Sequence, residues 1–503
     1  MADSCEVLAF TLTQQTSDPS ALTEDEASDL FQSLLNALHA RQAATFHYKS
    51  ALASSLTHLV RCFTRNHDTG TSSSPSPEAA ASRHRARFLL LLHPHCEALP
   101  CLLASDACAE DNGVKWRVAS CAALALVVEL AERDSVSEAK LLQALWVDHH
   151  LERLVHLATN ALAPQLLRDS ASAVLTQVAL RELGAGALKD LGLVSHLAKL
   201  CAEAPSEALA QGERVLQSPC QLLGAMLVSL PKHSELGEDC LRFLSSVKGP
   251  LSQVLAPSDV FGSTAGLRTA ESVVSLLGAA LGALDSGRRD RKLLECFPDY
   301  HGTLLEPSAH LLELLGSFPS SMLPLGDKAW SSLQPLTPGE VAASRIVVPP
   351  PPRASGPWTA FDTMKAEAWW SFAVALSLTL HRMPKTSPCS SVNLAPLLAC
   401  AAAIAEPLVR GGATNDENDE WGWFGTQALE VAEMLLSLAV GRWWVSGADE
   451  RTATKASLVN LLPRLEALHS MTPASSVYGA SSESELFLKK FCQALAREFD
   501  TSQ

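Results

Sequence analysis

Four helical stretches of this 503-residue chain open with an arginine followed by a mixture of small and apolar residues. The openings start at Arg117, Arg168, Arg214 and Arg268, so successive arginines are 51, 46 and 54 residues apart. A period of about 40 to 50 residues is the scale of a two- or three-helix repeat. Small residues let neighbouring helices approach, and leucines between them fill a continuous core. The recurrence therefore predicts a stack of helical repeats.

The composition favours the same fold class. Hydrophobic residues make up 47% of the chain, and there are only 3 tyrosines. The apolar residues are mainly alanine and leucine, which favour helices, whereas β-branched and aromatic residues favour strands. No alternating strand pattern appears between residues 85 and 333. We therefore expect an all-α protein.

Two breaks rich in proline divide the chain. The first contains Ser72–Pro77, and the second contains four consecutive prolines at Pro349–Pro352, which favour an extended polyproline segment. A capping box at Thr23 and Glu26 marks the first helix. The predicted organisation is an N-terminal helical segment (1–66), a Ser/Pro-rich linker (67–84), helical repeats (85–335), a Pro-rich linker (336–357) and a C-terminal helical block (358–503).

One segment between the predicted helices has a recognisable pattern. In Leu191–Leu200, a glycine at position 192 precedes a helix with leucine at every third or fourth place, and Asp148–Leu157 has a similar pattern without the glycine. These segments resemble the links of armadillo and HEAT repeats. The resemblance implies a right-handed α-solenoid, in one stack or in two blocks, that binds a protein partner on its concave face. The Trp-Asn ladder of importin-α-type proteins is absent, so binding of nuclear localisation signals is not indicated.

The charge distribution favours a basic partner. The formal net charge is −15, and the basic clusters at 83–87 and 288–292 are short, as expected for solvated helix ends or loops. A nucleic-acid-binding protein usually has a basic patch or stripe, so no nucleic acid is expected as a partner. An acidic protein more readily attracts a partner with a basic surface.

The predicted partner-binding residues lie in one acidic loop. Its carboxylates are followed by aromatic side chains of the kind enriched at interface hot spots. The alternative is that these aromatics begin the next helix and pack inward. The spacing does not fit a calcium-binding EF-hand loop. The predicted contact residues are Asp416, Glu417, Asp419, Glu420, Trp421 and Trp423.

A metal site is a weaker interpretation elsewhere. His149, Glu152 and His156 fall on one face of a predicted helix, but their spacing differs from the zinc-protease pattern. No phosphate-binding loop or nucleophile motif is present either. We therefore predict a non-catalytic scaffold or adaptor without a cofactor. The alternatives are a regulatory or chaperone-like subunit of a larger complex, and an enzyme with a metal site between helices.

The 13 cysteines lie scattered in apolar helical stretches, as at Cys121, Cys220 and Cys400. This is typical of small buried residues in a reducing compartment. No apolar run reaches the length of about 18 residues that a membrane span requires. We expect a cytoplasmic protein, with the nucleus as the alternative location.

Overall fold

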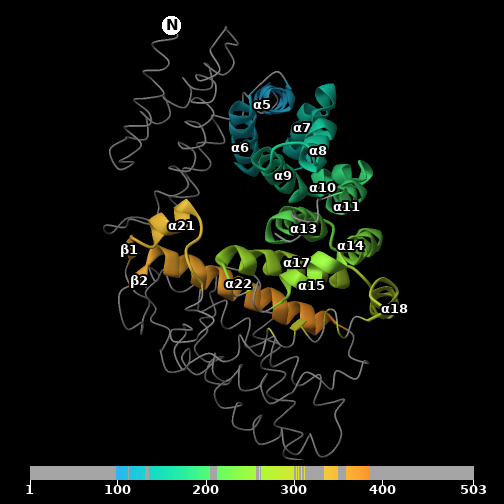
Figure 1. The fold of residues 1–503 in the computed structure, drawn as a ribbon. Helices are drawn as coiled ribbons and strands as arrows, with labels where there is room; N and C mark the ends of the chain where they lie inside the picture. The colour runs from blue at the N-terminus through green and yellow to red at the C-terminus, as the bar shows by residue number, and fades with distance from the viewer. Residues whose placement is uncertain are drawn as a thin grey trace, which may run out of the picture. The chain divides into compact units, whose positions relative to one another are not determined.

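The structure is a computed structural model of the whole chain (Figure 1). It describes residues 98–383, with gaps at 111–112, 131–134, 204–211, 257–259, 261 and 349–357 and across most of 300–332. Helices account for most of the described residues, which confirms the all-α prediction for this part of the chain. The chain divides into two compact units. Unit 1 comprises residues 1–204 and 218–231, and unit 2 comprises residues 205–217 and 232–503.

The described part of unit 1 is built from short helices joined by tight turns. Helix α13 (Gly212–Ser229) belongs to this unit from Ser218 onward. The preceding helices are α5 (Ala98–Cys108), α6 (Val114–Leu130), α7 (Ser135–Trp146), the 3-10 turn η3 (Val147–His149), α8 (His150–Thr159), α9 (Gln165–Ala179), α10 (Glu182–Asp190) and α11 (Leu193–Glu203).

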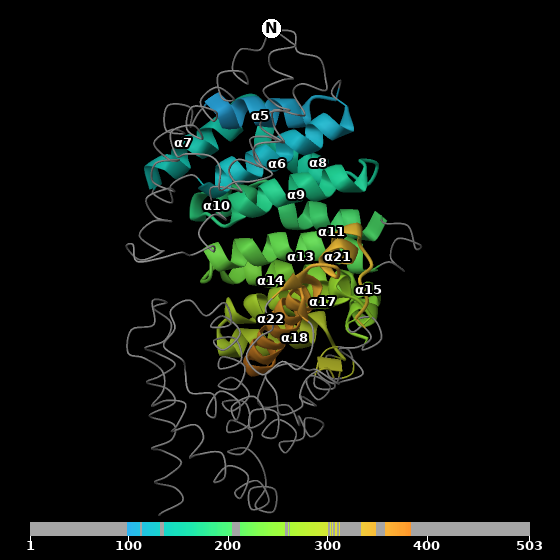
Figure 2. The same cartoon turned by 90° about the vertical axis from the view of Figure 1, so that its left-hand side faces the viewer.

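Several helices of unit 1 pack against helices that come later in the chain. Helix α9 lies beside α6, and α10 and α11 contact α7 and α8 (Figure 2). The buried side chain of Arg181 donates a hydrogen bond to the Val128 carbonyl oxygen, 53 residues away. Ser218 in α13 donates to Asp169 in α9, 49 residues away, at 3.4 Å. These separations match the spacing of 46 to 54 residues in the sequence.

The recurrent arginines have a common contact in two of the helices. In α6, Arg117 Nε donates to the Ala107 carbonyl oxygen at 2.8 Å, at the end of α5. In α9, Arg168 Nη1 donates to the Ala161 carbonyl oxygen at 2.9 Å, just beyond the end of α8. The last carbonyls of a helix lack partners within the helix, and a cation is favourable at that end. The recurring arginine therefore joins one helix to the end of the preceding one.

The two links that resemble each other in sequence also share a backbone feature. Gly192, between α10 and α11, has φ of 68°. Asp148 and His149, before α8, have φ of 54° and 57° although neither is glycine. A left-handed conformation costs a residue with a Cβ atom roughly 1–2 kcal/mol, whereas glycine adopts it freely. Both links therefore turn through left-handed residues, and the one that lacks glycine is strained.

Replacing Gly192 with alanine tests this turn. A Cβ atom at Gly192 would meet no atom within 4 Å, so the only cost is the left-handed φ. We expect G192A to lower the free energy of unfolding by about 1–2 kcal/mol, measured by chemical denaturation. The matched control is G186A in α10, where a Cβ atom is equally unobstructed. That variant should be neutral or more stable by up to about 1 kcal/mol. Equal effects of the two substitutions would contradict the prediction.

Unit 2 contains longer helices and one small antiparallel pair of strands. Strand β1 (Val347–Val348) pairs with β2 (Trp358–Thr359), with Val348 opposite Trp358. The described helices are α14 (Ser234–Ser246), α15 (Lys248–Val254), α17 (Thr264–Gly282), α18 (Ser286–Cys296), α21 (Pro338–Ala343) and α22 (Ala360–Arg382).

Helices α17 and α22 form the most extensive contact in unit 2 and run side by side (Figure 1). The Thr379 hydroxyl donates to the Val274 carbonyl oxygen at 2.8 Å, and Arg382 Nη1 donates to the Gly278 carbonyl oxygen at 2.9 Å. A Cβ atom at Gly278 would lie 2.4 Å from Thr379 Oγ1, so only glycine permits this approach. The tryptophans Trp369 and Trp370 of α22 are buried, as expected for core residues.

The predicted Pro-rich linker at 336–357 contains regular structure at its start. Helix α21 begins after Thr337, which forms a capping box with Glu340 and has proline at the first helical position. This pattern is a recognised helix start, although the prolines further along had indicated an extended segment. The four consecutive prolines lie outside the described residues.

Several sequence predictions concern residues that the structure does not describe. They include the capping box at Thr23, the segments 1–66 and 67–84, and the C-terminal block beyond residue 383. None of the described cysteines forms a disulfide bond, and all except Cys101 are buried. Burial raises the pKa of Cys108 to about 11 and that of Cys201 to about 12. No described helix combines the length and the apolar character that crossing a membrane requires.

Candidate partner-binding surface

The predicted contact loop, from Asp416 to Trp423, lies outside the described residues. The candidate surface is therefore assembled from the charged side chains that the structure does describe. Two groups stand out, and both lie in unit 2. One spans α14 and α18, and the other spans α17 and α22.

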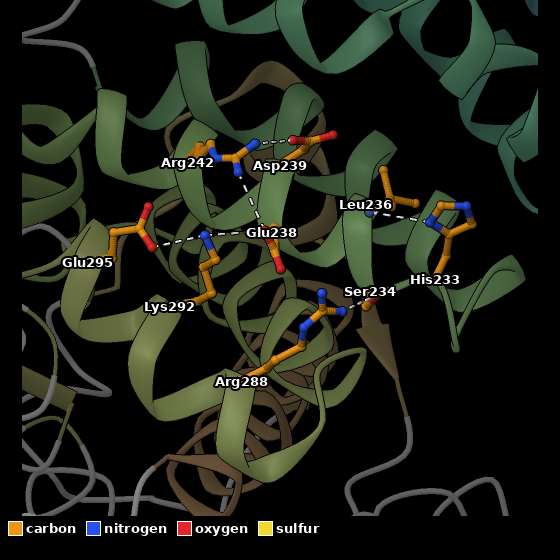
Figure 3. Close-up of polar contacts among 9 residues, drawn as sticks. All are labelled: His233, Ser234, Leu236, Glu238, Asp239, Arg242, Arg288, Lys292 and Glu295. Atoms are coloured by element: carbon orange, nitrogen blue, oxygen red, sulfur yellow. Dashed lines mark hydrogen bonds and ion pairs between the residues drawn. The ribbon is translucent and has the colours of Figure 1, made fainter.

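Charged side chains of α14 and α18 form a chain of ion pairs (Figure 3). Glu238 is central, because its Oε2 lies 3.4 Å from both Arg242 Nη2 and Lys292 Nζ. Arg242 also contacts Asp239 at 2.8 Å, and Lys292 contacts Glu295 at 2.9 Å. Each carboxylate of this cluster lies within ion-pair distance of a basic side chain.

Most basic side chains of the run at 288–292 bind partners within unit 2. Arg288 Nη1 donates to the Ser234 hydroxyl at 3.1 Å (Figure 3). Arg289 donates to the carbonyl oxygens of Leu284 and Arg382, at 3.1 and 3.2 Å. The run therefore lies within α18 and joins this helix to the start of α14 and to the chain at the ends of α17 and α22.

A second group of charges lacks such pairing. Arg268 and Glu271 lie one turn apart on α17, and Arg268 also acts electrostatically on Glu367 of α22. Within the described residues, neither carboxylate makes a hydrogen bond or an ion pair at contact distance. Ser275, one turn further along α17, is exposed. We call Arg268, Glu271 and Glu367 the acidic strip.

The acidic strip carries more negative than positive charge. Partial loss of hydration against the helices raises the pKa of Glu271 and of Glu367, and the nearby Arg268 charge opposes this shift. A carboxylate in this setting gains stability from an additional positive charge. The strip can therefore accept a lysine or arginine side chain from outside the chain.

The three residues of the predicted metal site do not form such a site. His149 Nδ1 lies 3.3 Å from Glu152, and both side chains are largely exposed. His156, further along α8, is also exposed. The described residues contain no cluster of three or more histidine, cysteine or acidic side chains that could hold a metal ion.

The glycine-rich turn before α17 acts as a helix start, because the Ser263 hydroxyl accepts a hydrogen bond from the Gly266 amide at 2.8 Å.

The neighbouring His150 was not singled out in the sequence, and its environment is unusual. Its side chain is 2% exposed, and neither ring nitrogen has a hydrogen-bond partner within the described residues. Burial lowers the pKa of His150, the Asp148 charge opposes this shift, and the Arg153 charge adds to it. The burial depends on packing between α5 and α8, which local sequence does not report.

His150 should make the stability of unit 1 depend on pH. Because its pKa is lower in the folded state than the ordinary value of 6.5, the unfolded state binds the proton more readily. Stability is therefore full above the unfolded pKa and falls as the pH drops through about 6.5. We expect H150L to lose less thermal stability than the wild type between pH 7.5 and 5.5. The control is H156L, with an exposed histidine on the same helix, and a wild-type-like pH dependence in H150L would refute the assignment.

Comparisons with known proteins give no family assignment: no protein-family model matches the chain, and no curated protein matches it.

Proposed function

We propose that this protein is a non-catalytic helical-repeat scaffold or adaptor that binds a basic segment of a partner protein. The observation that carries the proposal is the pairing of helices one sequence period apart. In unit 1, hydrogen bonds join residues 53 and 49 positions apart, and in unit 2 they join residues 54 and 51 positions apart. Helices that repeat in this way offer an extended surface to a partner.

The arrangement of three successive helices supports the same proposal. Helices α7, α8 and α9 have counterparts in α10, α11 and α13, with similar backbone turns at Gly192 and at Asp148 and His149. Three-helix units of this kind are typical of armadillo-like repeats. On the proposed solenoid, the partner would lie along the concave face.

The chemistry of the partner follows from the charges. The whole chain has a formal net charge of −15, and the two carboxylates of the acidic strip have no close partner within the described residues. A lysine- or arginine-rich segment would supply the missing positive charge. We propose the cytoplasm as the location, with the nucleus as the alternative, because the described cysteines form no disulfide bond.

Neutralising the acidic strip tests this function. A partner would first be captured with the full chain, and a photoreactive residue in place of the exposed Ser275 would report which of its segments lies nearby. We expect that segment to be rich in lysine and arginine. The double variant E271Q/E367Q should then raise the Kd for this partner about tenfold, because two charge contacts are lost. The difference should shrink at high salt.

The matched control is D239N/E295Q, which removes the same number of charges from the paired cluster of α14 and α18. This variant should bind the partner like the wild type. The proposal would be refuted if E271Q/E367Q bound as tightly as the wild type, or if Ser275 crosslinked to an acidic segment.

A further inference from the structure

Helix α21 begins at an exposed threonine that precedes a proline. Thr337 is exposed, as are Leu336 and Pro338 beside it. Residues 333–336 have no regular secondary structure. A threonine followed by proline is the sequence that proline-directed protein kinases require. The exposed hydroxyl and the irregular segment before it give such an enzyme access to this position.

The hydroxyl of Thr337 is next to the contact that holds α21 in place. Its Oγ1 accepts a hydrogen bond from the Glu340 amide at 3.2 Å. In return, the Glu340 carboxylate accepts hydrogen bonds from the amides of Thr337 and Leu336 at 2.9 and 3.0 Å. The Thr264 hydroxyl also donates to this carboxylate. Glu340 thereby joins α21 to the first turn of α17.

The Glu340 carboxylate carries its negative charge in this contact. Burial raises its pKa, but the hydrogen bonds from Thr264, Thr337 and Leu336 outweigh burial, so the net shift is downward. The side chain is only 6% exposed. Water therefore screens its charge poorly, and a second negative group placed beside it would be strongly repelled.

We propose that Thr337 is a phosphorylation site of a proline-directed kinase, and that its phosphate releases α21 from α17. The kinase would transfer the terminal phosphoryl group of a nucleoside triphosphate to Thr337 Oγ1. The hydroxyl proton passes to the base of the kinase, and the nucleoside diphosphate leaves. The phosphate adds a charge of about −1.5 to −2 at pH 7. Next to the buried Glu340 carboxylate, this added charge repels the carboxylate.

Because α21 is short, little free energy is needed to release it from α17. The helix has six residues, and an isolated helix of this length is unstable in water. Its order therefore depends on contacts with the rest of unit 2, which include the hydrogen bonds of Glu340 and the packing of α21 against α22. The first turn of α21 follows Thr337 directly, so the folded helix fixes the backbone next to this residue. The released segment can adapt to the kinase and would therefore be the better substrate. Opening and phosphorylation then favour each other, because any modification that is stable only in the open form shifts the equilibrium toward it.

The test uses the full chain, a purified proline-directed serine/threonine kinase and ATP. Mass spectrometry locates the phosphate, and hydrogen exchange follows the amides of residues 339–343 and 264–268. We expect phosphate on Thr337 and at least about tenfold faster exchange in α21. The variants E340Q and T264V, which weaken the contact, should be phosphorylated at Thr337 several-fold faster than the wild type.

A second capping box provides the matched control. Thr359 and Asp362 form the same motif at the start of α22, but alanine follows Thr359. Thr359 should remain unmodified, and exchange near it should not change. T337A removes the cap without adding charge, so phosphorylation should open α21 more than this variant does. T337S retains the hydroxyl and should behave like the wild type.

Two outcomes would overturn the proposal. In the first, the kinase modifies a synthetic peptide of residues 331–343 but leaves Thr337 unmodified in both the wild type and E340Q. In the second, Thr337 is phosphorylated but exchange in α21 stays at the wild-type rate. The kinase can also modify other Ser-Pro or Thr-Pro pairs of the chain. T337A keeps those pairs, so any change in exchange that persists in phosphorylated T337A comes from them and not from Thr337.

Discussion

Within each of the two units, arginine side chains donate hydrogen bonds to carbonyl oxygens at the C-terminal ends of helices. The last carbonyls of each helix need donors from outside the helix, and arginine supplies several donors together with a favourable charge. The arginines that act in this way, each with its acceptor carbonyl, are Arg117 with Ala107, Arg153 with Cys108, Arg181 with Val128, and Arg289 with Leu284 and Arg382. Each of these hydrogen bonds joins the helix that carries the arginine to the end of another helix. The arginines therefore help to position neighbouring helices.

The two groups of charged side chains in unit 2 differ in how their carboxylates are paired. Along α14 and α18, Glu238 faces both Arg242 and Lys292, so its charge is balanced by neighbours. On α17 and α22, the close approach at Gly278 brings the helices together, and Arg382 is occupied with a carbonyl. Arg268 alone then opposes Glu271 and Glu367. The acidic strip thus lies on a closely packed helix pair but has only one cation for two carboxylates.

Sequence predicts those features of the fold that depend on local patterns. The openings at Arg117, Arg168 and Arg268 lie in helices, and the turn at Gly192 has the left-handed backbone that its glycine indicates. Sequence did not predict the burial of His150 or the proximity of Arg268 to Glu367, because both depend on helices that are distant in the chain. Helix α21 was not predicted, because the four prolines at 349–352 indicated a linker over 336–357, although Thr337 and Glu340 have the spacing of a capping box.

The capping boxes of α21 and α22 show that one local motif can have two structural roles. Both have a threonine at the N-cap and a carboxylate three residues later. Helix α22 has 23 residues and is packed along α17, so its fold does not depend on Asp362. Helix α21 has six residues, and Glu340 links it to Thr264, 76 positions earlier in the chain. The shorter helix therefore relies more on contacts outside itself, among them the Glu340 carboxylate and the packing against α22, than the longer helix does on its cap.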